Sequence, residues 1–494
     1  MFVQYLGGSL ASAAVNLTQP VLVSLPYLAQ FGGAVQAARQ MLRASQDALK
    51  RWSGDKALDA ALRLAEEQGV VSPQEVHQLM AQAGGHATLR SGDGTRAGDA
   101  LAKAQNFTAK SLLAWGKVFS APEQFNRRVT FIAAYRTAQA QRMADPGAFA
   151  TDAVAQTQFT YNKGNKPKWA RGAVGSTLFT FKQFGISYVE LLARMGTAGA
   201  PGSAERKAGQ RAALLGLGML VLMSGIDGLP FEDDLEDLID GLMQKLGYNW
   251  STKLAKREAI ASLFGEEFTQ FMLKGVSGVP GLTIDVSGRL GLGNLIPGTG
   301  LLTTKDDHTR DVAEVFGVVG DLAMRGVKAG GQLFSGEVGE AAKTIAPKAI
   351  YNMLKGYDMA MTGAYKDDRG YKVIDTTEAE ALFKFAGFQP SSVARVQEGL
   401  AEGRNLIALN KSTESQIAAK WARGIYEGDD DAVVQARSDL AQWNTDNPDS
   451  RIRINFVQIR RRVQAMREDK ETRLMKTAPK EIRAAVRQQL EGTR

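Results

Sequence analysis

Apolar residues recur at helical spacing over most of this 494-residue chain, and this pattern predicts a mainly α, multi-helix fold, with an elongated shape as one option. One instance follows the helix-start signal at Ser120, where Phe125, Val129, Ile132 and Tyr135 share one helical face. Hydrophobic residues make up 44% and charged residues 23%, so the chain can bury a core. We expect the arginines beside the stripe to form a solvated flank: Arg127, Arg128 and Arg136.

Two stretches interrupt the helical pattern. Residues 275–302 are rich in glycine and apolar residues, which predicts an irregular loop with short extended pieces. Residues 363–375 place short β-prone arms around Asp-Asp-Arg-Gly, which predicts a short β-hairpin. Thr376 or Thr377 then caps a predicted helix that runs to Phe385.

The glycine-rich stretch resembles a phosphate-binding loop only superficially. The segment from Gly293 to Gly298 has the glycine spacing of a P-loop, but Thr299 follows it where a P-loop requires lysine. Residues 275–302 instead fit one of two alternatives, a packed insertion or a membrane-inserting tip.

These patterns predict four parts along the chain. Residues 1–98 form apolar N-terminal helices and a flexible loop, and 99–270 form a central helical domain. Residues 271–362 contain the glycine-rich loop and further helices. Residues 363–494 contain the hairpin and a basic helical C-terminal domain.

Two apolar segments raise the question of membrane contact. Residues 1–38 carry no charged side chain, and prolines break the stretch, so a buried helical hairpin is favoured over a membrane span. A charge-free start at Met1 also fits a segment of a longer protein. Residues 212–226 are too short to cross a bilayer, which favours a core helix with close packing at Gly216 and Gly218. The residues that would contact a membrane are Leu214, Leu217, Leu220, Val221 and Leu222.

The basic character belongs to the C-terminus. Residues 451–494 contain 13 Lys or Arg against 5 Asp or Glu, which accounts for the whole net charge of +8. Clustered cations can bind nucleic-acid phosphates, although a solvated face paired with carboxylates is the commoner outcome. Arg460, Arg461 and Arg462 cannot all point one way, because successive helical residues turn by about 100°. The candidate nucleic-acid residues are Arg451, Arg453, Arg460, Arg461, Arg462 and Lys476, together with Lys166, Lys168, Trp169 and Arg171 in a basic turn.

Motifs of catalysis are missing from the sequence. It has no cysteine and three scattered histidines, which argues against thiolate or histidine-rich metal sites. It also lacks nucleophile-elbow, zincin and kinase signatures. The acidic residues from 232 to 240 could suggest a metal site, but a solvated helix face is favoured. We therefore expect no enzymatic activity, no cofactor and no metal.

Several segments resemble the C-terminal region of large phage and prophage polyvalent proteins of the PLxRFG type. They lie in order after residue 120, although the PLxRFG string itself does not occur. The segments are YNKGNKPKWARGAVGSTLFTFKQF (161–184), LPFEDDLEDLIDGLMQKLGYNWSTK (229–253), DVSGRLGLGNLIPGTGLL (285–302), FAGFQPSSVARVQ (385–397) and APKEIRAAVR (478–487).

The resemblance implies a non-enzymatic internal virion protein of a bacteriophage. Such a protein is delivered with the genome and contributes to DNA ejection or to an envelope-spanning conduit. Its expected partners are phage DNA, other virion proteins, copies of itself and the host inner membrane. It would lie in the virion interior and then in the host cell envelope or cytoplasm. The alternative is a soluble helical scaffold or a DNA-associated part of a prophage polyvalent protein. A cryptic enzyme is a third reading, which no motif supports.

Overall fold

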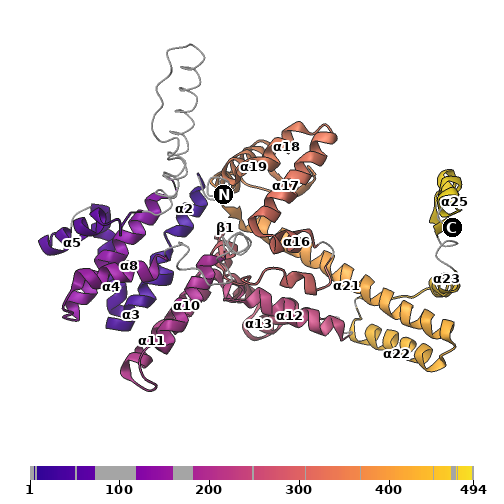
Figure 1. Cartoon of the computed structure of the whole chain (residues 1–494), viewed down its shortest axis with the longest axis horizontal. Helices are drawn as coiled ribbons and strands as arrows, with labels where there is room; N and C mark the ends of the chain where they lie inside the picture. The colour runs from indigo at the N-terminus through magenta and orange to yellow at the C-terminus, as the bar shows by residue number, and fades with distance from the viewer. Residues whose placement is uncertain are drawn as a thin grey trace, which may run out of the picture. The chain divides into compact units, whose positions relative to one another are not determined.

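The protein is mainly α-helical, as the periodicity predicts. The structure, a computed structural model, describes residues 5, 8–50, 53–72, 118, 120–159, 182–246, 250–305, 308–367, 369–448, 450–468, 474–475 and 477–491. Figure 1 shows the elements in order from indigo to yellow. The described part divides into two compact units: Met1–Leu238, Thr252–Leu301 and His308–Glu398 form the larger, and Ile239–Ser251, Leu302–Asp307 and Gly399–Arg494 the smaller. The predicted four-part division stays a prediction.

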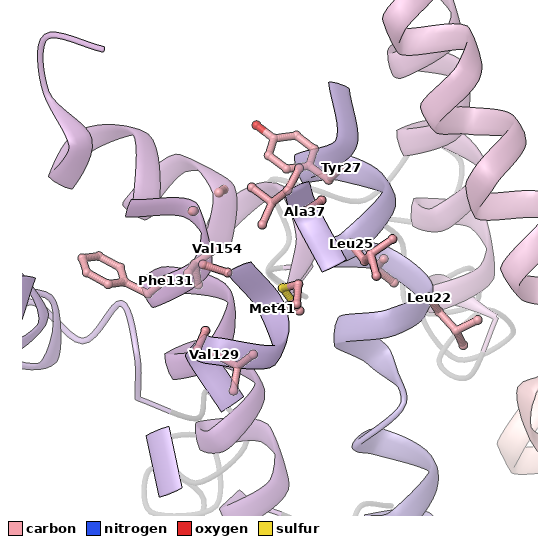
Figure 2. Packing of buried hydrophobic residues seen from close by; sticks show 14 of the residues in the cluster. Leu22, Leu25, Tyr27, Ala37, Met41, Val129, Phe131 and Val154 are labelled. Carbon is pink, nitrogen blue, oxygen red and sulfur yellow. The ribbon is translucent and has the colours of Figure 1, made fainter. Parts of the chain in front are cut away.

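The N-terminal helices of the larger unit build its main core. Leu22, Leu28 and Ile132 are buried there, and Figure 2 shows Met41 lying between Val129 and Leu25. Much of the uncharged N-terminal stretch thus packs inside the protein, although Leu10, Leu17 and Val35 are exposed. The elements are α2 (Leu10–Asn16), the π-helical turn η1 (Pro20–Ser24), α3 (Leu25–Gly32), α4 (Ala34–Lys50), α5 (Lys56–Glu67), a helix over 120–140, α8 (Pro146–Thr157), α10 (Gln183–Thr197) and α11 (Ala204–Ser224).

The apolar stripe after Ser120 is confirmed as part of the core. The prediction that the arginines beside it form a solvated flank is wrong. Arg127 is buried and its guanidinium lies 2.9 Å from Glu123, one helical turn earlier. Arg128 and Arg136 lie within 2.5 Å of Glu66 and Asp47 on other helices. The sequence pattern missed these ion pairs because two of the partners are distant along the chain.

Helix α11 packs through small residues. A Cβ added at Gly209 would lie 2.0 Å from the carbonyl oxygen of Met195, and one at Gly216 would lie 2.8 Å from Leu192 Cδ2. These contacts explain the close approach to α10, whereas a Cβ at Gly218 would meet open space. The prediction of close packing is confirmed at Gly216 and wrong at Gly218.

Short elements follow α11 and lead through the glycine-rich stretch. Leu290, Leu292 and Leu295 are buried within it, so this part of the stretch is a packed insertion. The elements are the 3₁₀ turn η4 (Ile226–Gly228), α12 (Glu232–Lys245), α13 (Thr252–Phe264), α14 (Glu266–Lys274), the 3₁₀ turn η5 (Gly275–Gly278), β1 (Ile284–Asp285), α15 (Ser287–Leu290) and the 3₁₀ turn η6 (Thr299–Leu302).

The predicted hairpin is confirmed. Strand β2 (Ala364–Lys366) pairs antiparallel with β3 (Lys372–Asp375), and β1 pairs antiparallel with β4 (Gln389–Pro390). Thr377 then begins the expected helix, with a capping box to Glu380. The helices around these strands are α16 (Thr309–Val315), α17 (Gly317–Phe334), α18 (Val338–Ile345), α19 (Lys348–Thr362) and α20 (Glu378–Phe385).

The C-terminal helices follow the expected succession of helix and short turn. Ala418 and Ala422 of α21 pack against Ile459 and Val463 of α23 in a small separate core. The elements are α21 (Ser391–Glu427), α22 (Asp430–Asp446), α23 (Phe456–Arg467), the 3₁₀ turn η7 (Lys480–Ile482) and α25 (Arg483–Glu491).

Candidate nucleic-acid interface

Local hydrogen bonds fix the start of α23. The side chain of Asn455 accepts a hydrogen bond from the backbone N–H of Val457 at 2.9 Å. In turn, the side-chain oxygen of Gln458 accepts a hydrogen bond from the backbone N–H of Asn455. One face of the helix is then held against α21 by the buried side chains of Ile459 and Val463. The remaining faces of α23 point away from this core.

The segment that leads into α23 is also held in place. Asn444 of α22 bonds both backbone groups of Ile452, at 2.7 Å and 3.0 Å, and the Ile452 side chain is buried. Arg451 and Arg453 flank it and are exposed.

Among the described residues, the arginines of this region lack carboxylate partners. Within the part of the chain that the structure describes, no Asp or Glu lies within 4.0 Å of their guanidinium groups. Arg462, which is half-buried, instead donates to Ser415 Oγ at 3.0 Å. The others are exposed. These residues, which we name the α23 arginine cluster, are Arg451, Arg453, Arg460, Arg461, Arg462 and Arg467.

Helical geometry places the arginines of α23 on different faces of the helix. Arg460 and Arg467 are seven residues apart and share a face, since seven steps of about 100° nearly complete two turns. Arg461 points about 100° away from Arg460. The predicted divergence of Arg460, Arg461 and Arg462 fits the contact of Arg462 with α21. Sequence reasoning did not select Arg467, although its spacing from Arg460 could have identified it.

An aromatic stack borders the cluster. The Trp421 ring on α21 packs edge-to-face on Phe456 with centroids 6.3 Å apart, and the Arg437 guanidinium lies 5.6 Å from the Trp421 centroid. This stack fixes the first turn of α23 to its neighbours. The helix is thus held in place, and its arginines have no carboxylate partner among the described residues, which leaves their guanidinium groups able to bind phosphate oxygens.

The other predicted basic residues lie outside the described residues. They are Lys166, Lys168, Trp169, Arg171 and Lys476.

The predicted membrane-contact residues of α11 differ in exposure. Leu214 is 67% exposed and Leu222 is 52% exposed, whereas Leu220 is buried. Leu217 and Val221 are half-buried. Among the described residues, no helix has both the length and the apolarity needed to cross a membrane.

The acidic residues of α12 form a charge cluster around a lysine. Ligand oxygens of Glu232, Asp233 and Glu236 lie within 4.8 Å of one another, as in a metal site. Lys256 of α13, however, places its ammonium 2.7 Å from Glu236 Oε1 and 2.7 Å from Asp227 Oδ1, and it also contacts Glu232. The lysine thus supplies the positive charge that the carboxylates require.

Helix α12 also contains a buried carboxylate, that of Asp234. Asp234 is 1% exposed, and its Oδ2 accepts from the backbone N–H groups of Leu295 and Ile296 at 2.7 Å and 3.0 Å. Its Oδ1 accepts from the Thr299 hydroxyl at 3.1 Å. The prediction of a solvated acidic face is therefore wrong at Asp234, which holds the glycine-rich stretch in place.

Burial perturbs the Glu232 carboxyl of the acidic cluster strongly. It raises the pKa of Glu232 to about 8, and the nearby carboxylate of Glu236 adds to the effect while Lys256 opposes it. The cluster is thus a partly neutralised charge network inside the larger unit.

Comparison with known proteins identifies no relative. The chain matches no family model, no curated protein and no solved structure.

Proposed function

We propose that this chain is a non-enzymatic internal virion protein of a bacteriophage, packaged with the genome and delivered with it, where it contributes to DNA ejection or to an envelope-spanning conduit. The observation that carries the proposal is the α23 arginine cluster, which a packed helix and its leading segment present and which has no carboxylate partners among the described residues. The resemblance of several segments to phage polyvalent proteins supports the same reading.

Phage DNA is the partner that this surface fits. A duplex carries one negative charge per about 1.7 Å of helix axis, so each arginine that reaches a phosphate gains affinity by releasing condensed counterions. Cations already paired with carboxylates would gain much less, because the pairs would have to be broken. The binding is expected to be independent of base sequence, since phosphate contacts carry no sequence information.

The direct test is DNA binding by the full chain as a function of salt concentration. Reversal of three exposed cluster charges, as Arg460→Glu, Arg461→Glu and Arg467→Glu together, is expected to abolish most of the affinity at low salt. Each lost phosphate contact lowers the slope of log affinity against log salt by about 0.9. Filter binding or fluorescence anisotropy with a short duplex measures both quantities.

A matched control separates this surface from net charge alone. Arg39, Arg43 and Lys50 are exposed on α4, and their joint replacement by Glu changes the net charge equally. We expect the control to retain nearly all of the salt slope. An equal loss in both triple variants would contradict the assignment of DNA binding to α23.

Packaging is tested separately, by mass spectrometry of purified virions from a lysate in which this gene is expressed. We expect the chain in the particle, in the virion interior, and after infection in the host cell envelope or cytoplasm with other virion proteins and with copies of itself. Virions that contain no peptide of this chain would refute the virion proposal while leaving DNA binding intact.

The alternative is a soluble helical scaffold, or a DNA-associated part of a prophage polyvalent protein. It is favoured by the buried face of α11, where Gly209, Gly216 and Leu220 pack inside the protein. Flotation with liposomes of bacterial phospholipid distinguishes the two readings. Recovery of the chain with the liposomes favours host inner-membrane contact, and recovery in the unbound fraction favours the scaffold.

A further inference from the structure

Helix α4 has its larger apolar side chains on its exposed side. Its inward side consists of three alanines and a methionine that are buried in the main core, and Figure 2 labels two of these residues, Ala37 and Met41. Val35, Leu42 and Leu49 are instead 67%, 64% and 74% exposed. A helix that served only the core would place its largest apolar side chains inside. Packing of the larger unit therefore does not account for these three residues.

The three exposed side chains form one row along the helix. They are spaced by seven residues, which nearly completes two turns, so they point in the same direction. The row points about 140° away from the buried side, since Leu42 is five residues after Ala37. Its length is about 21 Å. Single exposed leucines are ordinary on protein surfaces, whereas a contiguous apolar row marks a contact surface.

Cations lie alongside this row. Arg43 follows Leu42 and Lys50 follows Leu49 in the sequence, so each of these cations lies about 100° round the helix from a leucine. Arg39 lies on the same side of the row as Arg43 and Lys50, and all three are exposed. The exposed side of α4 is thus an apolar row with a cationic row beside it.

The exposed side of α4 has no negative charge to balance these cations. The single carboxylate of the helix, that of Asp47, is half-buried and lies 2.5 Å from the guanidinium of Arg136. Within the described ranges, none of the three exposed α4 cations forms an ion pair. Two copies of this side brought together would place like charges next to one another, which disfavours a second copy as the partner.

We propose that the exposed side of α4 binds the surface of an anionic phospholipid bilayer. This side, which we name the α4 outer face, consists of Val35, Arg39, Leu42, Arg43, Leu49 and Lys50. A helix that lies in the plane of a membrane inserts its apolar side chains at the boundary of the acyl chains, while its Lys and Arg side chains meet the anionic headgroups. A DNA duplex offers phosphates without an apolar layer, so the exposed leucines would gain nothing from it. The assignment rests on the host inner-membrane contact of the proposed function and gives that contact a surface.

The test is partitioning of the full chain onto vesicles, measured by flotation over a range of lipid concentrations. The chain carries Arg460→Glu, Arg461→Glu and Arg467→Glu, which removes the attraction of α23 for anionic lipid. One set of vesicles is phosphatidylcholine alone, and the other is phosphatidylcholine with phosphatidylglycerol in equal parts. We expect the partition coefficient to be at least ~10-fold higher on the mixed vesicles, because each cation gains from the anionic surface.

Two variants separate the apolar row from the cations. Leu42→Ser with Leu49→Ser should lower the partition coefficient on the mixed vesicles by at least ~10-fold, because two apolar side chains no longer enter the lipid. Arg39→Gln, Arg43→Gln and Lys50→Gln together should lower it by at least ~10-fold as well, and should remove the preference for phosphatidylglycerol. All five positions are exposed, so neither variant disturbs the core.

The matched control is Leu214→Ser with Leu222→Ser on α11, the helix that the sequence suggested for membrane contact. These two leucines are also exposed, but Leu215 and Met223 follow them where α4 has an arginine and a lysine. We expect this pair of changes to alter the partition coefficient by less than ~2-fold.

Three results would overturn the proposal. The first is that the chain does not bind the mixed vesicles, which would also remove the membrane contact of the proposed function. The second is that the α4 leucine pair loses no more binding than the α11 pair. The third is that the α4 pair changes the oligomeric state in analytical ultracentrifugation and leaves vesicle binding unaltered, which would make this side an interface between copies. Membrane contact survives the last two results, and DNA binding by α23 survives all three.

Discussion

Asp234 makes the sharpest prediction about how the glycine-rich stretch is held. The replacement Asp234→Ala removes the acceptor of two backbone N–H groups, those of Leu295 and Ile296, at 2.7 Å and 3.0 Å. A buried donor left without a partner costs about 1–3 kcal/mol. The Thr299 hydroxyl retains a second acceptor, Asp237, at 3.1 Å. Two orphaned donors therefore destabilise the stretch by about 3 kcal/mol.

Native-state hydrogen exchange measures this loss at the affected amides. A decrease of about 3 kcal/mol in the free energy of local opening speeds exchange of the Leu295 and Ile296 amides by about 100-fold, since 1.4 kcal/mol corresponds to tenfold. Asp234→Asn retains an acceptor for these donors and loses mainly the charge, so its effect should be nearer tenfold.

The control for this experiment is on the same helix. Asp237→Ala removes an acceptor of the Thr299 hydroxyl and leaves both backbone bonds of Asp234 in place. Its amide exchange at Leu295 and Ile296 should stay within a few-fold of the unaltered protein. If the exchange rates of these two amides in Asp234→Ala also stayed within a few-fold of those in the unaltered protein, the reasoning would be refuted.

Two further predictions concern a charge and a glycine. Because burial raises the pKa of Glu232 to about 8, the unfolded chain releases that proton first as pH rises, so this residue's contribution to stability is lost between about pH 4.5 and pH 8. Glu232→Gln should weaken the decline of the urea midpoint from pH 5 to pH 8, and an unchanged slope contradicts this cause. Gly356→Ala should destabilise the hairpin region by about 1–3 kcal/mol, because its Cβ would meet the backbone of Phe385. Gly326→Ala in α17 meets open space and should stabilise instead, as thermal melting of both variants will show.

Local sequence signals predicted the elements well. Thr377 with Glu380 is a capping box that is readable in four residues, and the turn between β2 and β3 follows from its own composition. The core face of the helix over 120–140 was also predictable, because burial of Val129 follows from helical spacing alone. Such features depend on neighbours within a few residues.

Long-range partners were not predictable in the same way. Lys256 lies 24 residues from Glu232, and Asp234 reaches 61 residues along the chain to Leu295. A single sequence does not show which of its many charges meet across such separations. Whether the α23 arginine cluster has carboxylate partners among the described residues was likewise not predictable, because it depends on where the acidic residues of α21 and α22 lie.

The lysine at the centre of the acidic cluster has a consequence for how the protein responds to its surroundings. The counter-ion of Glu232 and Glu236 is covalently attached to the chain, so dilution cannot release it and a chelator cannot extract it. A dissolved divalent ion would first have to displace Lys256 from its hydrogen bonds. This region should therefore keep its structure equally in a magnesium-rich solution and in one containing EDTA.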